Sequence, residues 1–282
     1  MHASWSKALI LHLIRIFPPY LKLLQSPLWL AAGYGHEDVM KYLLDKVSCS
    51  TNNFIETINM DNSSGDSPLI AAASRGHVGT LDIILRQIER IDSESIELII
   101  AKTNNSGDTA LSVASGAGEI KCVDLLINWG MKVKEGADII NFTNKNNLTP
   151  LLIACERGHA DIAIKLVESG ASPIKDKNGA SPFSVAAFCG CTEVVEKLLH
   201  HDFGKRLLNA KDDAGGCTPL WLAARTGNRK MVNILLQSGA DLTIANNDGL
   251  TPLKAAEKYS KQDVIDEINK FEKENNLSNN VN

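Results

Sequence analysis

The stretch TPLWLAARTGNRKMVNILLQSGAD, residues 218–241, contains the pattern that decides the fold. Thr218 can accept a hydrogen bond from an amide of the first helical turn, and Pro219 suits the first helical position, where its missing N–H costs nothing. Gly227 then ends that helix in a left-handed conformation that a side chain would resist. Apolar residues at helical spacing follow, and Ser-Gly-Ala at 238–240 ends a second helix. The stretch therefore predicts two short helices joined by a glycine turn.

The same pattern returns seven times, with starts that lie 32–42 residues apart. Each copy has alanine five residues after its first residue, and such a small residue at every copy indicates that two helix backbones approach closely. Glycine stands nine residues after the start in six copies, and Ser260 replaces it in the last one. The copies begin at Ser26, Ser67, Thr109, Thr149, Ser181, Thr218 and Thr251. The glycines are Gly35, Gly76, Gly118, Gly158, Gly190 and Gly227.

A turn signature precedes each start from the second copy onward. Five residues before the start stands Asn or Asp, whose side chain can bond its own backbone, and two residues before it stands Gly or Asn, which accept a positive φ. The pattern therefore predicts a turn that leads into each first helix. The Asn and Asp positions are Asn62, Asn104, Asn144, Asp176, Asp213 and Asn246, and the Gly and Asn positions are Gly65, Gly107, Asn147, Gly179, Gly216 and Gly249.

The repeated unit resembles the ankyrin repeat, through T-P-L-x-x-A-A, G-H at the inter-helix turn and G-A-D after the second helix. This resemblance covers about residues 26–268 and implies an all-α ankyrin-repeat solenoid of stacked helix-turn-helix units with β-turn or hairpin-like tips. In that family the tips and first helices line a concave face. Outside the repeats, we predict an apolar N-terminal capping segment over 1–25 and a polar, Asn-rich, disordered tail over 269–282.

Several copies carry extra residues after the second helix. In one of them, Ser93 or Ser95 can cap a short helix that contains Ile96 and Leu98–Ile100. Two interpretations stay open for these segments. They either cover the back of the solenoid as a third short helix or form a second binding edge.

Composition and charge narrow the classes of function. The 282 residues carry a net charge of −4 and the sequence pI is about 6.0, so we expect no nucleic-acid partner. The six cysteines fit no zinc-site spacing, and no catalytic constellation, metal site or cofactor motif stands out in the sequence. We therefore expect a protein that is not an enzyme and uses no cofactor. We also expect it to be a monomer in the cytoplasm.

The N-terminal segment allows an alternative to a purely cytoplasmic location. Residues 8–17 are apolar, but His12 and Arg15 interrupt them, and the run is shorter than the roughly 20 residues that a membrane span needs. We expect no membrane contact. Association with a membrane through Ala8–Leu24 is kept as an alternative.

The resemblance to ankyrin repeats implies that the chain is a scaffold or adaptor that binds another protein on the concave face. One setting that would suit such an adaptor is an effector that an intracellular microbe delivers into the host cytosol. Another hypothesis is that the chain is the regulatory part of a larger enzyme.

The candidate contacts for a partner protein are turn-tip and first-helix residues. Trp221 allows a second interpretation, in which it fills the core beneath the turn. Acidic tips followed by basic tips also suggest a change of charge along the face. The predicted partner-binding residues are Tyr34, Asp66, Arg75, Asp108, Lys145, Arg157, Lys177, Phe188, Arg225 and Trp221.

Overall fold

A computed structural model describes residues 27–47, 58–91, 95–132 and 139–279, and within these ranges it contains helices and no strand. The chain divides into two compact units, Met1–Lys145 and Asn146–Asn282. The helices of the first unit are α2 (Pro27–Gly33), α3 (Glu37–Val47), α5 (Pro68–Ser74), α6 (Val78–Ile91), α7 (Ser95–Ile100), α8 (Ala110–Ala117) and α9 (Ile120–Gly130). The helices of the second unit are α10 (Pro150–Arg157), α11 (Ala160–Glu168), α12 (Pro182–Cys189), α13 (Thr192–His200), α14 (Asp202–Leu207), α15 (Pro219–Thr226), α16 (Arg229–Gln237), α17 (Pro252–Lys258) and α18 (Gln262–Asn279).

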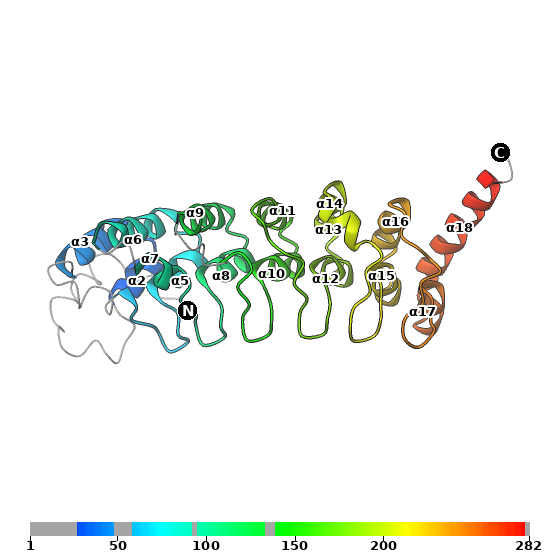
Figure 1. The fold of residues 1–282 in the computed structure, drawn as a ribbon, viewed down its shortest axis with the longest axis horizontal. Helices are drawn as coiled ribbons and strands as arrows, with labels where there is room; N and C mark the ends of the chain where they lie inside the picture. The colour runs from blue at the N-terminus through cyan, green and yellow to red at the C-terminus, as the bar shows by residue number, and fades with distance from the viewer. Residues whose placement is uncertain (1–26, 48–57, 92–94, 133–138, 280–282) are drawn as a thin grey trace. The chain divides into compact units, whose positions relative to one another are not determined.

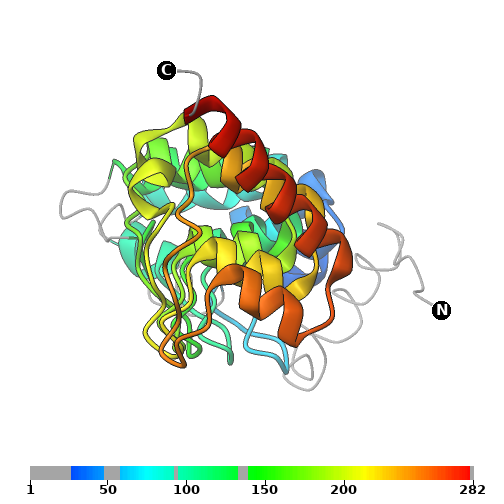
Figure 2. The same cartoon turned by 90° about the vertical axis from the view of Figure 1, so that its right-hand side faces the viewer.

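Each unit is built from two rows of helices. In the first unit α2, α5 and α8 pack side by side, and α3, α6 and α9 form the second row (Figure 1). In the second unit α10, α12, α15 and α17 form one row, and α11, α13, α16 and α18 form the other. Figure 2 shows that the turns leading into α12, α15 and α17 project to the same side of the second unit. This arrangement is the predicted stack of helix-turn-helix units.

The core lies between the two rows and depends on the repeated alanine. All seven of these alanines are fully buried at 0% exposure, which lets neighbouring first helices approach closely. Leucine, isoleucine, valine and methionine side chains from the second helices fill the remaining space. The seven alanines are Ala31, Ala72, Ala114, Ala154, Ala186, Ala223 and Ala256.

The predicted helix caps are present in the described copies. The hydroxyl of Thr149 accepts a hydrogen bond from the Leu152 N–H at 3.2 Å, and the hydroxyl of Thr218 accepts one from Trp221 N–H at 3.2 Å. The same contact starts α5, α8, α12 and α17. Among these six first helices, proline occupies the first turn of all but α8, which begins with Ala110. Ser26, the predicted cap of the first copy, lies outside the described residues.

The inter-helix glycines adopt the predicted left-handed conformation. Gly158 and Gly227 both have φ of 82°, and the four other glycines at this position also have positive φ. Ser260, which replaces the glycine in the last copy, is held in the same region at φ 55°. Asn147, which replaces glycine in the turn, has φ 59°, as its tolerance for this region predicted. The conformation therefore belongs to the position in the repeat, whichever residue occupies it.

Replacement of Gly158 by valine tests this backbone requirement. A β-branched side chain opposes the left-handed region, and a Cβ at this position would lie 3.3 Å from Sγ of Cys191, so we expect a loss of about 1–2 kcal/mol in unfolding free energy. Urea denaturation followed by far-UV circular dichroism measures the loss. Gly158→Asn is the matched control, because asparagine accepts this conformation, and it should cost less than valine. Equal stability of the valine variant and the wild type would contradict the assignment of the turn.

The turns before the first helices are closed by an Asn or Asp side chain. Oδ1 of Asn246 accepts hydrogen bonds from the N–H groups of Asp248 at 3.1 Å and Leu250 at 2.9 Å, and its own N–H donates to the Leu250 carbonyl. Asn62, Asn104 and Asp176 close their turns in the same way. Within each unit the turns are also linked by backbone hydrogen bonds, such as the one from Asn247 N–H to the Gly215 carbonyl.

One turn differs from the sequence prediction. We expected Asp213 to close the turn before α15, but Asp212 does so, because its Oδ1 accepts from the N–H groups of Gly215 at 2.8 Å and Cys217 at 3.1 Å. This turn has one residue more than the others, so the N–H of Asp212 donates to a carbonyl five residues ahead instead of four. Asp213 forms an ion pair with Lys175 instead.

Two of the segments with extra residues form a third short helix. Helix α7 packs against α6 and α9, and it buries Ile96, Ile99 and Ile100 while Leu98 is exposed. Helix α14 packs mainly against α13 and buries Phe203. The burial agrees with the interpretation that these segments cover the helical rows. A second binding edge stays an untested alternative.

The C-terminal segment differs from the predicted disordered tail. Helix α18 continues through residue 269 to Asn279, and Val264 and Ile268 are fully buried. Residues with good helix propensity and an ion pair of 3.8 Å between Lys270 and Glu274 support its later turns. The predicted capping segment over 1–25 lies outside the described residues.

Candidate functional site

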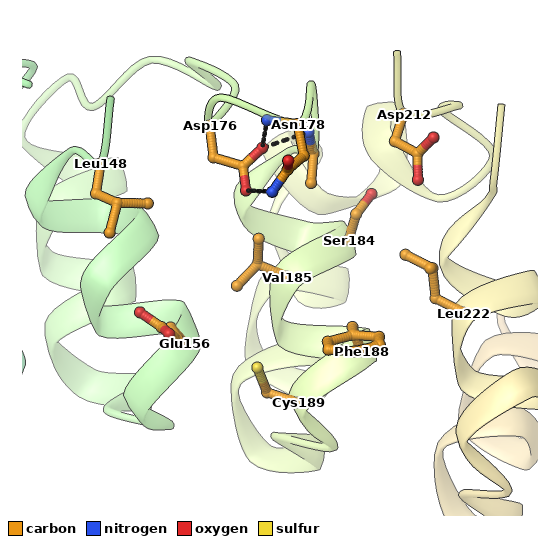
Figure 3. Close-up of a pocket in the computed structure, with 11 residues that line it drawn as sticks. Leu148, Glu156, Asp176, Asn178, Ser184, Val185, Phe188, Cys189, Asp212 and Leu222 are labelled. Carbon is orange, nitrogen blue, oxygen red and sulfur yellow. Dashed lines mark hydrogen bonds between the residues drawn. The ribbon is translucent and has the colours of Figure 1, made fainter. Parts of the chain in front are cut away.

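An open groove lies on the first-helix row of the second unit. It is lined by residues of α10, α12 and α15 and of the turns that precede them, and its volume is about 260 Å³ (Figure 3). Such a volume is below the roughly 300–1,000 Å³ of typical small-molecule sites. The lining residues are Leu148, Glu156, Asp176, Asn178, Ala180, Ser184, Val185, Phe188, Cys189, Asp212 and Leu222.

The apolar part of the groove centres on α12. Figure 3 shows Val185 and Phe188 one turn apart on this helix, with Leu148 on the α10 side and Leu222 on the α15 side. Phe188 is 47% exposed, whereas Leu222 is buried at 7% and supports the floor. An aromatic ring this exposed, beside an apolar floor, offers contact area that the fold itself does not use.

The polar part of the groove comes from carboxylates. Asp176 and Asp212 sit in the turns, where each uses Oδ1 to accept two backbone N–H groups, and Oδ2 of Asp176 accepts from Nδ2 of Asn178 at 3.4 Å. Glu156 is exposed near the end of α10. Turn geometry therefore fixes two of the acids, while the third lies on a helix.

Among the predicted partner-binding residues, Tyr34 and Arg75 are engaged inside the first unit. The Arg75 guanidinium lies over two aromatic rings, 5.4 Å from the centre of Trp29 and 5.2 Å from that of Tyr34. Its Nη1 donates a hydrogen bond of 2.7 Å to the carbonyl of Gly33 in the preceding repeat. These contacts join two neighbouring repeats. A role of Tyr34 and Arg75 in partner binding stays a prediction.

A similar arrangement occurs in the second unit. The Arg225 guanidinium lies 6.0 Å from the ring centre of Trp221 and 5.5 Å from that of Tyr259. Trp221 is only 4% exposed, and its Nε1 donates to the Leu250 carbonyl at 3.0 Å. This burial contradicts the inclusion of Trp221 among the partner contacts and agrees with the interpretation that it fills the core beneath the turn.

The two predicted acidic tips take part in a ladder of side chains in the first unit. Asp66 accepts from Nδ2 of Asn104 at 3.0 Å, and Asp108 accepts from Nδ2 of Asn144 at 2.7 Å. Each bond joins one turn to the next along the chain. Asp66 and Asp108 therefore support the turns, and a role of either residue in partner binding stays a prediction.

The remaining predicted residues are exposed. Lys145 is a tip residue whose N–H donates to the Ser106 carbonyl, and Lys177 places Nζ 3.2 Å from Oδ1 of Asn146. Arg157 ends α10, next to the groove residue Glu156. Of the ten predicted residues, only Phe188 lines the groove.

Sequence reasoning did not place Val185 and Leu222 in the site, and it considered Glu156 only as one of several residues at the ends of first helices. A signal was present, because Glu156 and Phe188 both stand seven residues after their caps, and Val185 and Leu222 both stand four residues after theirs. Equal positions in stacked repeats lie side by side on the same face. A search by repeat position would therefore have grouped these four residues.

The described cysteines are poorly suited to nucleophilic chemistry. Burial raises the pKa of Cys122 and Cys217 to about 11, and it raises those of Cys155, Cys189 and Cys191 as well. A thiol with a raised pKa is less reactive because the thiolate is the nucleophile. In the part of the chain that the structure describes, no group of three His, Cys, Asp or Glu side chains is placed to hold a metal ion. Among the same residues, no helix has the length and apolar character needed to cross a bilayer.

Segments of several longer proteins are similar in sequence to this chain. An ankyrin repeat protein of fowlpox virus is 32% identical over 143 residues, which cover 49% of this chain and 40% of that protein. The human transient receptor potential cation channel subfamily A member 1 is 33% identical over 127 residues, or 45% of this chain and 11% of the channel. Alpha-latrocrustotoxin of Latrodectus tredecimguttatus is 27% identical over 240 residues, or 84% of this chain and 14% of the toxin. The chain thus spans less than half the length of these relatives.

Structure comparison and family comparison agree on the fold. The human ASB11 ankyrin repeat domain superposes with a TM-score of 0.65 at 24% identity, over 86% of this chain and 97% of that domain. The family model for ankyrin repeats (3 copies) matches residues 1–95, 55–137, 131–207 and 201–279. Together with the repeated caps, glycine turns and paired helices, this match shows that the chain belongs to the ankyrin-repeat family.

Proposed function

We propose that the chain is a non-catalytic interaction scaffold that binds a partner protein on the face formed by its first helices and turn tips. Ankyrin repeats generally serve as protein-interaction modules, so the family favours this class of function. The observation that carries the proposal is Phe188, which is 47% exposed in an open groove whose floor is otherwise packed. Exposed aromatic residues beside a buried apolar floor are typical anchors of protein interfaces.

The architecture of the repeat explains why this face is available. The alanines, caps and glycines fix the backbone, and the second helices bury their apolar sides against the first row. Side chains four and seven residues after the cap are not needed for the turn or for the caps. They can therefore vary between repeats and recognise a partner without loss of the fold.

The double variant Arg157→Ala/Phe188→Ala tests the proposed face. Tagged wild-type and variant chains are used to capture partners from candidate cells, and each recovered protein is quantified by mass spectrometry. We expect at least one specific partner whose recovery falls about tenfold or more in the variant, with an unchanged far-UV circular dichroism spectrum. Met131→Ala, at a residue that is 71% exposed in the first unit, is the control. Equal recovery with the double variant would show that partners bind elsewhere.

A second candidate function is a regulatory segment of a longer protein. The similar sequences include a cation channel and the tyrosine-protein kinase HTK16 of Hydra vulgaris, of which the matched regions cover 11% and 17%. The genomic reading frame around the chain tests this candidate, which requires a catalytic or channel domain in the same frame. Delivery into a host cytosol by a microbe stays a hypothesis about the setting in which the scaffold acts.

A further inference from the structure

The charge of the groove in the second unit is of one sign. Glu156, Asp176 and Asp212 are all acidic, and among the described residues that line the groove none is lysine, arginine or histidine. The apolar residues lie between these acids, since Asp176 and Asp212 belong to the turns and Glu156 to the other end of α10 (Figure 3). The groove therefore has an apolar centre and an acidic rim.

Three cations of the second unit, Arg225, Lys177 and Lys175, make contacts outside this groove. The guanidinium of Arg225, a residue of α15, lies over the rings of Trp221 and Tyr259. Lys177 contacts Asn146, and Lys175 pairs with Asp213, which does not line the groove. None of these three cations lines the groove, so the charged residues among its lining are all negative.

The rim acids also keep acceptor capacity. Oδ1 of Asp212 closes its turn, whereas its Oδ2 accepts no hydrogen bond from any of the described residues. Glu156 is exposed, and it lines the groove near the C-terminal end of α10. A carboxylate with an unused oxygen can accept a charge-assisted hydrogen bond from a lysine or arginine.

We propose that this groove binds a segment of a partner protein in which an apolar side chain is flanked by lysine or arginine. The apolar side chain would pack on Phe188, Val185 and Leu222, and the flanking cations would reach Glu156 and the turn acids. This inference rests on the proposed function and specifies the chemistry of the partner. Charge complementarity selects this occupant, because phosphate groups and acidic segments would be repelled. The small, open volume suits one or two inserted side chains.

A random peptide library displayed on phage tests the proposal, because it samples many combinations of apolar and basic residues at once. The library is selected on the full chain without counter-selection, and the enriched sequence is made as a fluorescent peptide. We expect enriched peptides with Lys or Arg beside an apolar residue. Their affinity, measured by fluorescence anisotropy, should fall at least tenfold with Phe188→Ala and weaken as salt rises.

A charge reversal separates electrostatic recognition from apolar packing. Glu156→Lys should weaken the peptide about tenfold at low salt, and it should fold normally because a cation near the end of α10 is favoured by the helix dipole. Glu168→Lys is the matched control, since it makes the same charge change at an exposed site on α11 of the same unit. Its affinity for the peptide should stay close to that of the wild type.

Each outcome bears on the proposal in a different way. Enriched peptides that lack basic residues but still depend on Phe188 would overturn the charge preference and leave the proposed face intact. Peptides that bind both variants as well as the wild type would overturn the groove as a site. No enrichment at all would count against the proposed function itself. A dimer in light scattering that Phe188→Ala abolishes would show that a second copy of the chain occupies the groove.

Discussion

Replacement of Phe183 by alanine is expected to lower the free energy of unfolding by about 3–5 kcal/mol. Phe183 is 0% exposed and belongs to the largest fully buried side chains in the described part of the chain. It stands two residues after its cap, where the six other copies carry leucine. Helix α12 packs against both α10 and α15, so a cavity at Phe183 weakens two interfaces between repeats as well as its own repeat.

Two controls identify the cavity as the cause. Phe183→Leu restores the residue of the other copies and should cost only about 1 kcal/mol, because most of the apolar volume is kept. Phe188→Ala makes the same change as Phe183→Ala on the same helix, but at a side chain that is 47% exposed, so it should cost less than Phe183→Ala. Urea denaturation followed by far-UV circular dichroism measures all three variants. A loss below about 1 kcal/mol for Phe183→Ala would show that α12 does not pack as described.

The local features of the fold could be predicted because they depend on a few residues each. A threonine cap, a proline and a glycine turn act within one repeat, and the structure contains them at Thr149, Pro150 and Gly158. Repetition then supplied the arrangement of the helices, since identical units can stack in only a few ways. Even the substitution of glycine by Asn147 followed from backbone preferences.

The features that could not be predicted depend on contacts between repeats or on small changes of register. The turn before α15 has one extra residue, so Asp212 closes it and Asp213 does not. Counting five residues back from Thr218 gives Asp213, because the count assumes turns of equal length. The contact between Arg75 and Gly33 joins residues 42 positions apart. The sequence predicted that Arg75 was available on the surface, because its hydrogen-bond acceptor, the Gly33 carbonyl, lies in another repeat.

The candidate site was predictable only in part for the same reason. Phe188 was found because an aromatic residue at a helix end stands out in the sequence. The acidic rim was missed because Asp176 was interpreted only as a turn residue and Asp212 was not singled out at all, yet both border the groove. A residue that closes a turn can therefore also line the groove. The repeat pattern explains why Asp176 closes its turn, but it does not indicate that Asp176 borders the groove.

Replacement of Glu267 by alanine is expected to lower the free energy of unfolding by about 2 kcal/mol near neutral pH. Glu267 lies on α18 and is only 6% exposed. Its Oε1 accepts from Nδ2 of Asn233 at 2.6 Å, and its Oε2 accepts from Nε of Arg229 at 2.7 Å. Both donors belong to α16, so one carboxylate joins the last helix to the preceding repeat. The exposed Glu257 on α17 supplies the control, because Glu257→Ala should change stability by less than 0.5 kcal/mol or so.

The same carboxylate makes the stability of the second unit depend on pH. The hydrogen bond from Asn233, and then the one from Arg229, lower the pKa of Glu267 in the folded chain below its ordinary value of 4.5. A lowered folded-state pKa means that the stabilisation is fully present above the ordinary value and is lost as the pH falls through the folded-state pKa. We therefore expect the difference in unfolding free energy between the wild type and Glu267→Gln to be largest near neutral pH and to shrink below about pH 4.5. Urea denaturation at a series of pH values measures this difference, and a gap that stays constant on acidification would show that the carboxylate charge does not hold α18 to α16.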